Sequence, residues 1–600
     1  MKKNTIFLVL LLLFNIKIVF AQSFLREIPL SQQIENSSLV IEGKVTSKKS
    51  FWDAEHRLIY TSNTVEVYKV FKGKYIETVE VITVGGTVGL DALISSTSLK
   101  LREGNIGVFM LYNSNINLSQ SKQNNTNEFR PYSSSQGFYK YDLYGNTASN
   151  PFGKRDNIKS SFYKEITDKT RADYINVKSF DTSIYAKEAT VNKVLAITNF
   201  TPTTATAGTK SILTINGSGF GASPGTVSFA DADDGGASFM DALTTQIVSW
   251  SNTTIQVEIP SGAGTGKVRV NGVSTFTSAD DLTIEYSETN VEYDPDDDTE
   301  DTPPGTNGPL ERRAYNVQHI GGNAGLWRMQ TDFFNDTEHP GAKAAFERAI
   351  ETWRCNTGIN WTISSSATSI DIVSGSDANV VRFDNGAELD AGVLGTCYSF
   401  YLGCGSYPNY NWYVVGMDIV FDGSTNWNFG PDGTTALEYD FQTIALHELG
   451  HGHQLGHVND ANDLMNWSIG SNEEQRVLAS SNILAASIVQ TRSTASSVCG
   501  QLDAMDYAGS CSLSVVEDEL NNNLLVYPNP VRNQLFIESA STSNLVKAII
   551  YDINGRLISE YNISNPSKVK TIDLLNVSKG MYFLKIKSDT AEVTKKVMVH

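Results

Sequence analysis

The sequence predicts a multidomain protein in which all-β domains flank one α+β domain. With 600 residues the chain is too long for a single hydrophobic core, since cores stop growing beyond about 250–300 residues. Aromatic residues make up 10% of the chain, and short alternating runs lie between turn residues, which favours strands. Only residues 310–516 combine helical periodicity with strand-like runs.

The N-terminus predicts an exported protein. Residues 1–21 have the pattern of a signal peptide, with Lys2 and Lys3 before the apolar run 6–14 and small residues near Ala21. No later run is long and apolar enough to span a bilayer, so we expect no transmembrane segment in the mature chain. The net charge of -19 argues against a nucleic-acid partner and favours a secreted or cell-surface location.

Residues 22–187 are expected to form an N-terminal β domain. Strand-like runs at 39–45, 63–70, 78–84 and 106–112 predict a small β-barrel or sandwich. No catalytic cluster lies among them. Two roles are open for this domain, a folding accessory and an inhibitory propeptide.

Residues 193–286 have a second all-β character. The runs 213–221, 255–260 and 266–270 carry the pattern N-G-S-G-F-G followed by a hairpin, and the glycines suit turns and bulges. Over these residues the chain resembles the immunoglobulin-like IPT/TIG domains. The resemblance implies a spacer or binding module.

An acidic linker is expected at residues 287–309. Its like charges at 294–301 and the prolines that follow favour a solvated segment, open to proteolytic maturation. The clustered carboxylates also offer ligands for Ca²⁺, although clustering alone defines no coordination geometry.

The chemistry of the chain is concentrated in residues 441–465. Four of the eight histidines lie here, and His447, Glu448 and His451 form the pattern H-E-x-x-H. On a helix, positions i and i+4 share one face, so both imidazoles can bind one metal ion. Glu448 lies beside that face, where it can take a proton from a water activated by the metal.

A third histidine completes a candidate zinc site. Asp440 is a suitable N-cap for a helix over the motif, and Gly450, Gly452 and Gly456 favour its end. A chain that turns there can bring His457 to the metal. Three imidazoles with an open fourth position are typical of catalytic zinc.

These residues resemble the metzincin metalloendopeptidases, whose signature is H-E-x-x-H-x-x-G-x-x-H followed by a methionine-containing turn. His447, Glu448, His451 and His457 fit the spacing, and Met465 lies where the matrixin-like branch has its Met-turn. The resemblance implies an α+β domain that binds one Zn²⁺ and hydrolyses protein or peptide substrates, with Glu448 as general base. Gln454 departs from the signature, because that position is normally a glycine that permits the turn.

The resemblance also bears on latency. Matrixins often use a prodomain cysteine, but no cysteine precedes Cys355 in this chain. A cysteine switch is therefore excluded.

Other interpretations stay open. Glu473 or Glu474 could replace His457 as third ligand in a thermolysin-like enzyme, although Ser471 with Glu474 also fits a capping box of a helix over 471–490. His453 should point away from His451, as a surface or second-shell residue. A further alternative is a surface adhesin with a non-proteolytic zinc site.

The rest of residues 310–516 predicts the framework of this domain. Strands are expected at 326–331, 361–363, 370–373 and 417–421, and a helix at 341–354. All five cysteines lie here, and export makes disulfides expected. Short-range pairing suggests Cys397 with Cys404 and Cys499 with Cys511, which leaves Cys355 over.

Residues 524–600 predict a C-terminal β-sandwich. Asn554-Gly555 is a strong hairpin signal. The Y-P-N-P opening, the D-I-N-G-R turn and the K-G-M-Y-F-L-K-I strand resemble the sorting domain of type IX secretion cargo in the Bacteroidetes. The resemblance implies the type IX secretion machinery as a partner.

Overall fold

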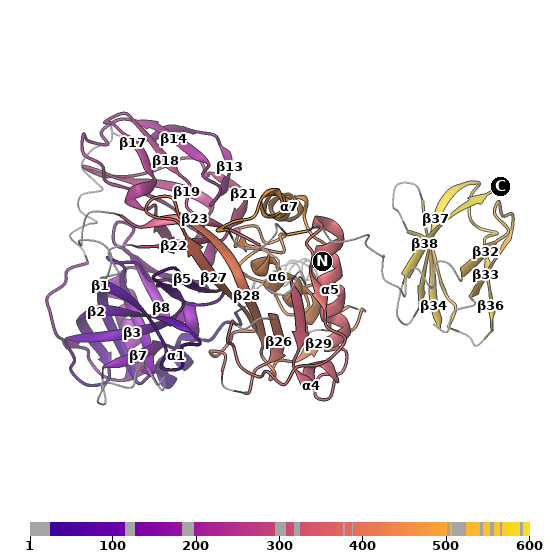
Figure 1. The fold of residues 1–600 in the computed structure, drawn as a ribbon, viewed down its shortest axis with the longest axis horizontal. Coiled ribbons are helices and arrows are strands. Elements are labelled where there is room, and N and C mark those ends of the chain that lie inside the picture. The colour runs from indigo at the N-terminus through magenta and orange to yellow at the C-terminus, as the bar shows by residue number, and fades with distance from the viewer. Residues whose placement is uncertain are drawn as a thin grey trace, which may run out of the picture. The chain divides into compact units, whose positions relative to one another are not determined.

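The computed structural model shows a multidomain, mostly β protein with few helices (Figure 1). It describes residues 25–114, 127–182, 197–294, 308–316, 325–375, 379–386, 388–431, 433–435, 437–500, 505–506, 524–539, 544–552, 557–564, 567–588 and 592–600. The expected signal peptide and the acidic cluster at 295–301 lie outside these residues. The chain divides into two compact units, Met1–Tyr507 and Ala508–His600.

The first part of the larger unit is a β-barrel. Strand β1 pairs with β2 on one side and with β6 on the other, which closes the sheet. Alternate residues of these strands, such as Ile41, Val65 and Val67, are buried inside. The strands are β1 (Leu39–Trp52), β2 (Ile59–Lys72), β3 (Thr78–Val84), β6 (Ile106–Asn113), β7 (Glu128–Pro131), β8 (Phe138–Asp142), β9 (Thr147–Asn150), β10 (Gly153–Asp156) and β11 (Ile175–Asn176), with helices α1 (Leu30–Asn36) and α2 (Tyr163–Thr170).

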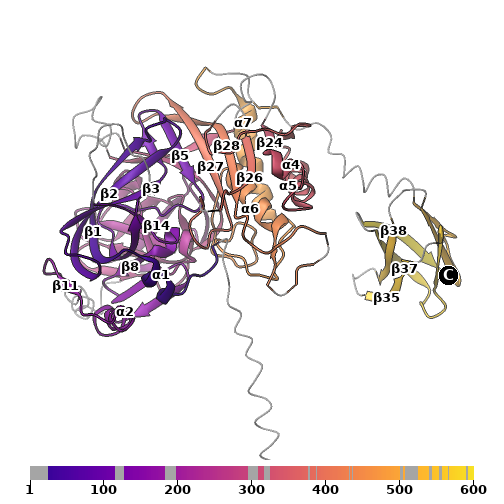
Figure 2. The same ribbon diagram turned by 90° about the horizontal axis from the view of Figure 1, so that it is seen from below.

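Two strands of the same region, β4 (Gly86–Val88) and β5 (Asp91–Ser95), belong to another sheet. They extend the mixed sheet of residues 310–500, where β5 pairs antiparallel with β27 (Gly395–Cys404). Figure 2 shows β5 beside β27 and β28. The N-terminal region is therefore joined to the histidine-bearing part by backbone hydrogen bonds.

The IPT/TIG region is all-β. Two four-stranded sheets, β12-β14-β18-β17 and β16-β15-β19-β20, enclose a core that includes Leu213, Phe220 and Val268. Its strands are β12 (Ile197–Thr201), β13 (Thr204–Ala207), β14 (Ile212–Gly217), β15 (Thr226–Asp231), β16 (Phe239–Asp241), β17 (Ile247–Trp250), β18 (Thr254–Glu258), β19 (Ala263–Asn271), β20 (Thr275–Thr277) and β21 (Thr283–Glu288).

Residues 310–500 form the mixed sheet β25-β24-β26-β28-β27, covered by helices. Trp327, Trp353, Trp361 and Trp412 are fully buried in its core. The elements are β22 (Asn290–Tyr293), β23 (Leu310–Tyr315), β24 (Leu326–Met329), α4 (Thr331–Phe334), α5 (Ala342–Thr357), β25 (Thr362–Ile363), β26 (Asn379–Phe383), β27, β28 (Asn411–Phe421), β29 (Trp427–Asn428), β30 (Tyr439–Asp440), α6 (Phe441–Gly452), β31 (Leu455–Gly456) and α7 (Ser480–Ala495).

Three expectations about this region are wrong. Residues 370–373 are not a strand, and β26 occupies that place in the sheet. Helix α7 begins at Ser480, because Asn482 accepts a hydrogen bond from the backbone N–H of Ala479 there. Part of the expected linker forms β22, which pairs with β23.

The cysteine pairing also differs from the prediction. A disulfide joins Cys404 to Cys499, 95 residues apart, whereas Cys397 is a buried thiol. Cys355, expected to be left over, is disulfide-bonded. Short sequence separation misled the prediction because β27 carries Cys397 and Cys404 seven residues apart along one extended strand.

The smaller unit is an all-β domain of two sheets. Sheet β32-β33-β36 faces sheet β35-β34-β37-β38 across a core that includes Leu535, Ile550 and Ile586. Strands β34 and β35 pair antiparallel, and the predicted Asn554-Gly555 turn between them lies outside the described residues. The strands are β32 (Leu524–Tyr527), β33 (Gln534–Ser539), β34 (Leu545–Asp552), β35 (Leu557–Asn562), β36 (Val569–Asp573), β37 (Gly580–Ser588) and β38 (Glu592–Val599).

A search of the described residues finds no helix with the length and apolar character needed to cross a membrane.

Candidate metal centre

Helix α6 presents the H-E-x-x-H motif from a buried position. Asp440 caps the helix as predicted, since its Oδ1 accepts a hydrogen bond of 2.8 Å from the backbone N–H of Thr443. Arg476 forms an ion pair with the same carboxylate. All twelve residues of the helix are buried, so its position in the core is closely determined.

The chain turns immediately after the helix, at the residue where the family signature has glycine. Gln454 has φ +68°, in the left-handed region that costs an L-residue about 1 kcal/mol or more. Its buried side chain accepts a hydrogen bond of 2.8 Å from the Tyr401 hydroxyl and donates one of 3.1 Å to the carbonyl of Gly452. These contacts hold the turn although the position is not glycine.

The turn brings His457 to His447 and His451. One ring nitrogen of each histidine lies within 4.8 Å of those of the other two, and Nε2 of His447 is 2.9 Å from Nε2 of His451. Nδ1 of His447 contacts the carbonyl of Leu464 at 2.8 Å, and Nδ1 of His451 that of Leu455 at 2.9 Å. With Nδ1–H as donor, each ring presents the Nε2 lone pair inward.

The environment keeps these rings suited to metal binding. Burial, reinforced by the neighbouring imidazoles, lowers the pKa of both His447 and His451 well below the usual value. Neutral imidazoles are the form that binds Zn²⁺. The three histidines are the only group of potential metal ligands found among the described residues.

Glu448 is fully buried beside the first histidine. Burial raises its pKa to about 7, although the hydrogen bond from Ser96 opposes the shift. Its Oε1 has no hydrogen-bond partner within the described part of the chain. A buried carboxylate oxygen of this kind is suited to hold a water molecule and to exchange a proton with it.

Met465 lies beneath the helix and is only 1% exposed. A Cβ atom at Gly450 would lie 2.4 Å from its Sδ, so the glycine inside the motif makes room for the methionine. The preceding residue, Leu464, supplies the carbonyl that orients His447. The predicted Met-turn residue therefore packs against the motif.

His453, Glu473 and Glu474 do not join the cluster. His453 is fully buried and contacts Thr357 Oγ1 at 3.1 Å between Trp353 and Trp361, so its expected surface position is wrong. Glu473 accepts a hydrogen bond from the backbone of Gly470. Glu474 accepts one from Thr434 and does not form the expected cap.

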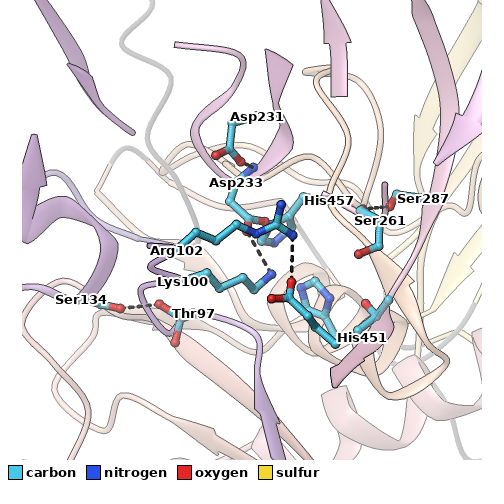
Figure 3. A network of polar contacts seen from close by, with 12 residues as sticks. Thr97, Lys100, Arg102, Ser134, Asp231, Asp233, Ser261, Ser287, His451 and His457 are labelled. Atoms are coloured by element: carbon cyan, nitrogen blue, oxygen red, sulfur yellow. Dashed lines mark hydrogen bonds and ion pairs between the residues drawn. The ribbon is translucent and has the colours of Figure 1, made fainter. Parts of the chain in front are cut away.

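Three residues at the centre were missed by sequence reasoning, because each comes from a distant segment without a motif. The Ser96 hydroxyl donates a hydrogen bond of 2.9 Å to Oε2 of Glu448. Asp233 contacts Nδ1 of His457 at 2.7 Å, and Lys100 contacts the other oxygen of Asp233 at 2.9 Å (Figure 3). Residues 96–100 line the pocket over His447 and His457.

Comparison with known families agrees with this arrangement. Residues 325–486 match the model of the matrixin family, residues 195–286 that of the IPT/TIG domain, and residues 525–600 that of the secretion system C-terminal sorting domain. No curated protein matches the chain. The chain therefore combines a metzincin-type matrixin domain with an IPT/TIG domain and a type IX sorting domain. The matrixin match implies zinc binding, and the sorting domain supports secretion or cell-surface attachment.

Proposed function

We propose that the protein is a secreted zinc-dependent endopeptidase that hydrolyses peptide bonds of proteins. The main support is the combination of three converging imidazoles with a buried glutamate whose Oε1 has no partner in the described chain. A structural zinc site needs no carboxylate there, so Glu448 favours the enzyme over an adhesin with a structural metal.

In this proposal His447, His451 and His457 hold the zinc ion. Bound zinc would supply Lewis acidity towards water and a peptide carbonyl. Glu448 takes a proton from the attacking water and delivers it to the leaving amine, a role that suits a carboxyl with a pKa near neutrality. Met465 contributes an apolar floor and does not ligate.

The test compares the full-length protein with its Glu448→Gln variant after limited proteolysis, by zinc content and by cleavage of casein. We expect one zinc per chain in both proteins and cleavage by the parent alone. Cleavage by the variant, or absence of zinc from the parent, would refute the mechanism.

Two single variants separate the rival ligand sets. His457→Ala should lose zinc, whereas Glu474→Ala should retain it, because Glu474 is hydrogen-bonded to Thr434 instead. The reverse pattern would support a thermolysin-like site.

We also propose that the N-terminal domain is an inhibitory propeptide. Strand β5 lies along β27 over five paired residues, from Ser95 opposite Tyr398 to Asp91 opposite Leu402. An extended segment that adds to a sheet edge takes the place that another strand, such as a peptide substrate, would need. The same segment continues directly over the histidines.

Ser96 links this strand to the proposed base. Its N–H donates to the carbonyl of Cys397, its hydroxyl oxygen accepts from the N–H of Cys397 at 3.0 Å, and the hydroxyl donates to Glu448. The next residue, Thr97, contacts Thr396 at 2.6 Å. These contacts would keep both the base and the adjacent strand edge from a substrate, without a cysteine.

The variant Ser96→Asp tests this latency. The substitution removes the hydroxyl that donates to Glu448 and places a second carboxylate beside that buried group, where the two repel each other. Loss of the hydrogen bond alone weakens the contact by about 1.5–3 kcal/mol. We expect the untreated full-length variant to cleave casein at least about tenfold faster than the parent. Ser47→Asp, on the exposed face of the barrel, is the matched control and should stay latent.

Two outcomes would count against these proposals. An untreated parent as active as Ser96→Asp would contradict inhibition by the N-terminal domain. Zinc in every protein, with no cleavage by the Ser96→Asp variant or by the proteolysed parent, would favour the adhesin alternative.

A further inference from the structure

The IPT/TIG domain shares a sheet with the turn that carries the third histidine. Strand β31, between His451 and His457, pairs antiparallel with β21 and joins the sheet β13-β21-β31. Thr289, just after β21, donates its N–H to the carbonyl of Gln454 at 2.8 Å and its hydroxyl to that of Leu455 at 3.0 Å. The backbone leading to His457 is thus held by another domain.

The same domain also reaches the imidazole of His457. Asp233 lies in a short helical turn after β15, and its backbone N–H is bound by the carboxylate of Asp231 at 3.1 Å. Its Oδ1 lies 2.7 Å from Nδ1 of His457. Figure 3 shows the Asp233 carboxylate beside the His457 ring.

The three histidines differ in what orients them. His447 and His451 donate to backbone carbonyls of their own domain, those of Leu464 and Leu455. His457 contacts a carboxylate, and that carboxylate belongs to the IPT/TIG domain. A carboxylate acceptor fixes the tautomer of a ligating histidine and makes its other nitrogen more basic.

We propose that Asp233 is a positioning residue of the metal centre, so that the IPT/TIG domain completes the zinc site and is not merely a spacer. The inference rests on the proposed zinc-binding function of the triad. Loss of such a carboxylate typically weakens metal binding about 10–100-fold.

An alternative role for Asp233 is purely structural. Asp233 also forms an ion pair with Lys100 of the N-terminal domain, and the pair could serve only to join the two domains. If so, removal of Lys100 should have the same effect as removal of Asp233. If Asp233 instead positions His457, removal of Lys100 should leave zinc affinity close to that of the parent.

The experiment measures zinc affinity by competition with a chelator, in full-length protein carrying Glu448→Gln to prevent autolysis. The variants are Asp233→Ala, Asp233→Asn and Lys100→Met, with Asp280→Asn as control because that aspartate is exposed on the same domain. Co²⁺ absorption spectra of each protein report the coordination of the site directly.

We expect Asp233→Ala to bind zinc about 10–100-fold more weakly than Asp280→Asn, with an altered Co²⁺ spectrum. Asp233→Asn should be intermediate, because an amide oxygen still accepts the Nδ1–H bond without the charge. The zinc affinity of Asp233→Asn therefore tests the proposal if Asp233→Ala fails to fold.

Equal affinity in the Asp233 variants and Asp280→Asn would overturn the role of Asp233, as would an equal loss in Lys100→Met. Absence of zinc from the parent would instead overturn the proposed function. The two failures are therefore distinguishable.

Discussion

Replacement of Gln454 by glycine tests how the turn between the second and third histidines is held. The substitution restores the family's residue and relieves left-handed strain of about 1–2 kcal/mol. It also leaves the buried Tyr401 hydroxyl without its acceptor, at about 1–3 kcal/mol. Loss of two buried methylenes costs about 1.6 kcal/mol, and the freer unfolded chain of glycine about 0.5–1 kcal/mol.

The losses exceed the gain, so we expect Gln454→Gly to lower the free energy of unfolding by about 3 kcal/mol. The assay is guanidinium unfolding followed by tryptophan fluorescence, in a Glu448→Gln background. Gln454→Ala should be about as stable as Gln454→Gly, because the strain of about 1–2 kcal/mol that alanine keeps is offset by one more buried methylene, worth about 0.8 kcal/mol, and by the absence of the glycine entropy cost of about 0.5–1 kcal/mol. Tyr401→Phe combined with Gln454→Gly should recover part of the loss, because no hydroxyl is then left unpaired.

A Gln454→Gly variant as stable as the parent would refute this reasoning. It would mean that the two side-chain hydrogen bonds of Gln454 do not outweigh the backbone strain. An alanine variant more stable than the glycine variant by about 1.5 kcal/mol would refute the strain itself, because alanine then gains its methylene and its lower chain entropy without a backbone penalty.

Three further predictions concern the same domain. Removing the Cys404–Cys499 disulfide by serine substitution should lower stability by about 2–4 kcal/mol in denaturant unfolding, since it closes a long loop; an unchanged midpoint would contradict this. Gly450→Ala should destabilise by about 1–3 kcal/mol and reduce zinc content, because the new Cβ meets Met465; unchanged zinc content and melting temperature would argue against this contact. Burial raises the pKa of Asp418 to about 6, so its protonated form is favoured by folding. The stability of the parent relative to Asp418→Asn should therefore fall by about 3 kcal/mol from about pH 3 to 7, measured by unfolding at each pH; a pH-independent difference would contradict it.

Much of the centre could be predicted because its information is local. The i, i+4 spacing of His447 and His451, the Asp440 cap and the distance to Met465 each depend on a few neighbouring residues. Gln454 could also be recognised in the sequence as a departure from the family signature, and its backbone is indeed left-handed, a conformation that favours glycine.

Local patterns failed where a distant partner decided the outcome. The cap expected at Ser471 did not form, because Glu474 bonds to Thr434, and α7 begins nine residues later. His453 was expected at the surface or near the metal ligands, and the surface position is wrong because Trp353 of α5 and Trp361 cover the ring. Cys404 forms a disulfide with Cys499, 95 residues away, because the fold brings their two segments together; the spacing of the cysteines in the sequence does not predict this pair.

The sequence by itself determined the helix and the histidines and glutamate that it presents, which are the proposed ligands and base, because helix periodicity and side-chain chemistry are local properties. Only the tertiary structure decided what surrounds them. Ser96 reaches Glu448 across 352 residues, and Asp233 reaches His457 across 224. Such contacts depend on how whole domains pack, since β5 adds to β27 and β31 adds to β21, and backbone pairing of that kind leaves no motif in the sequence.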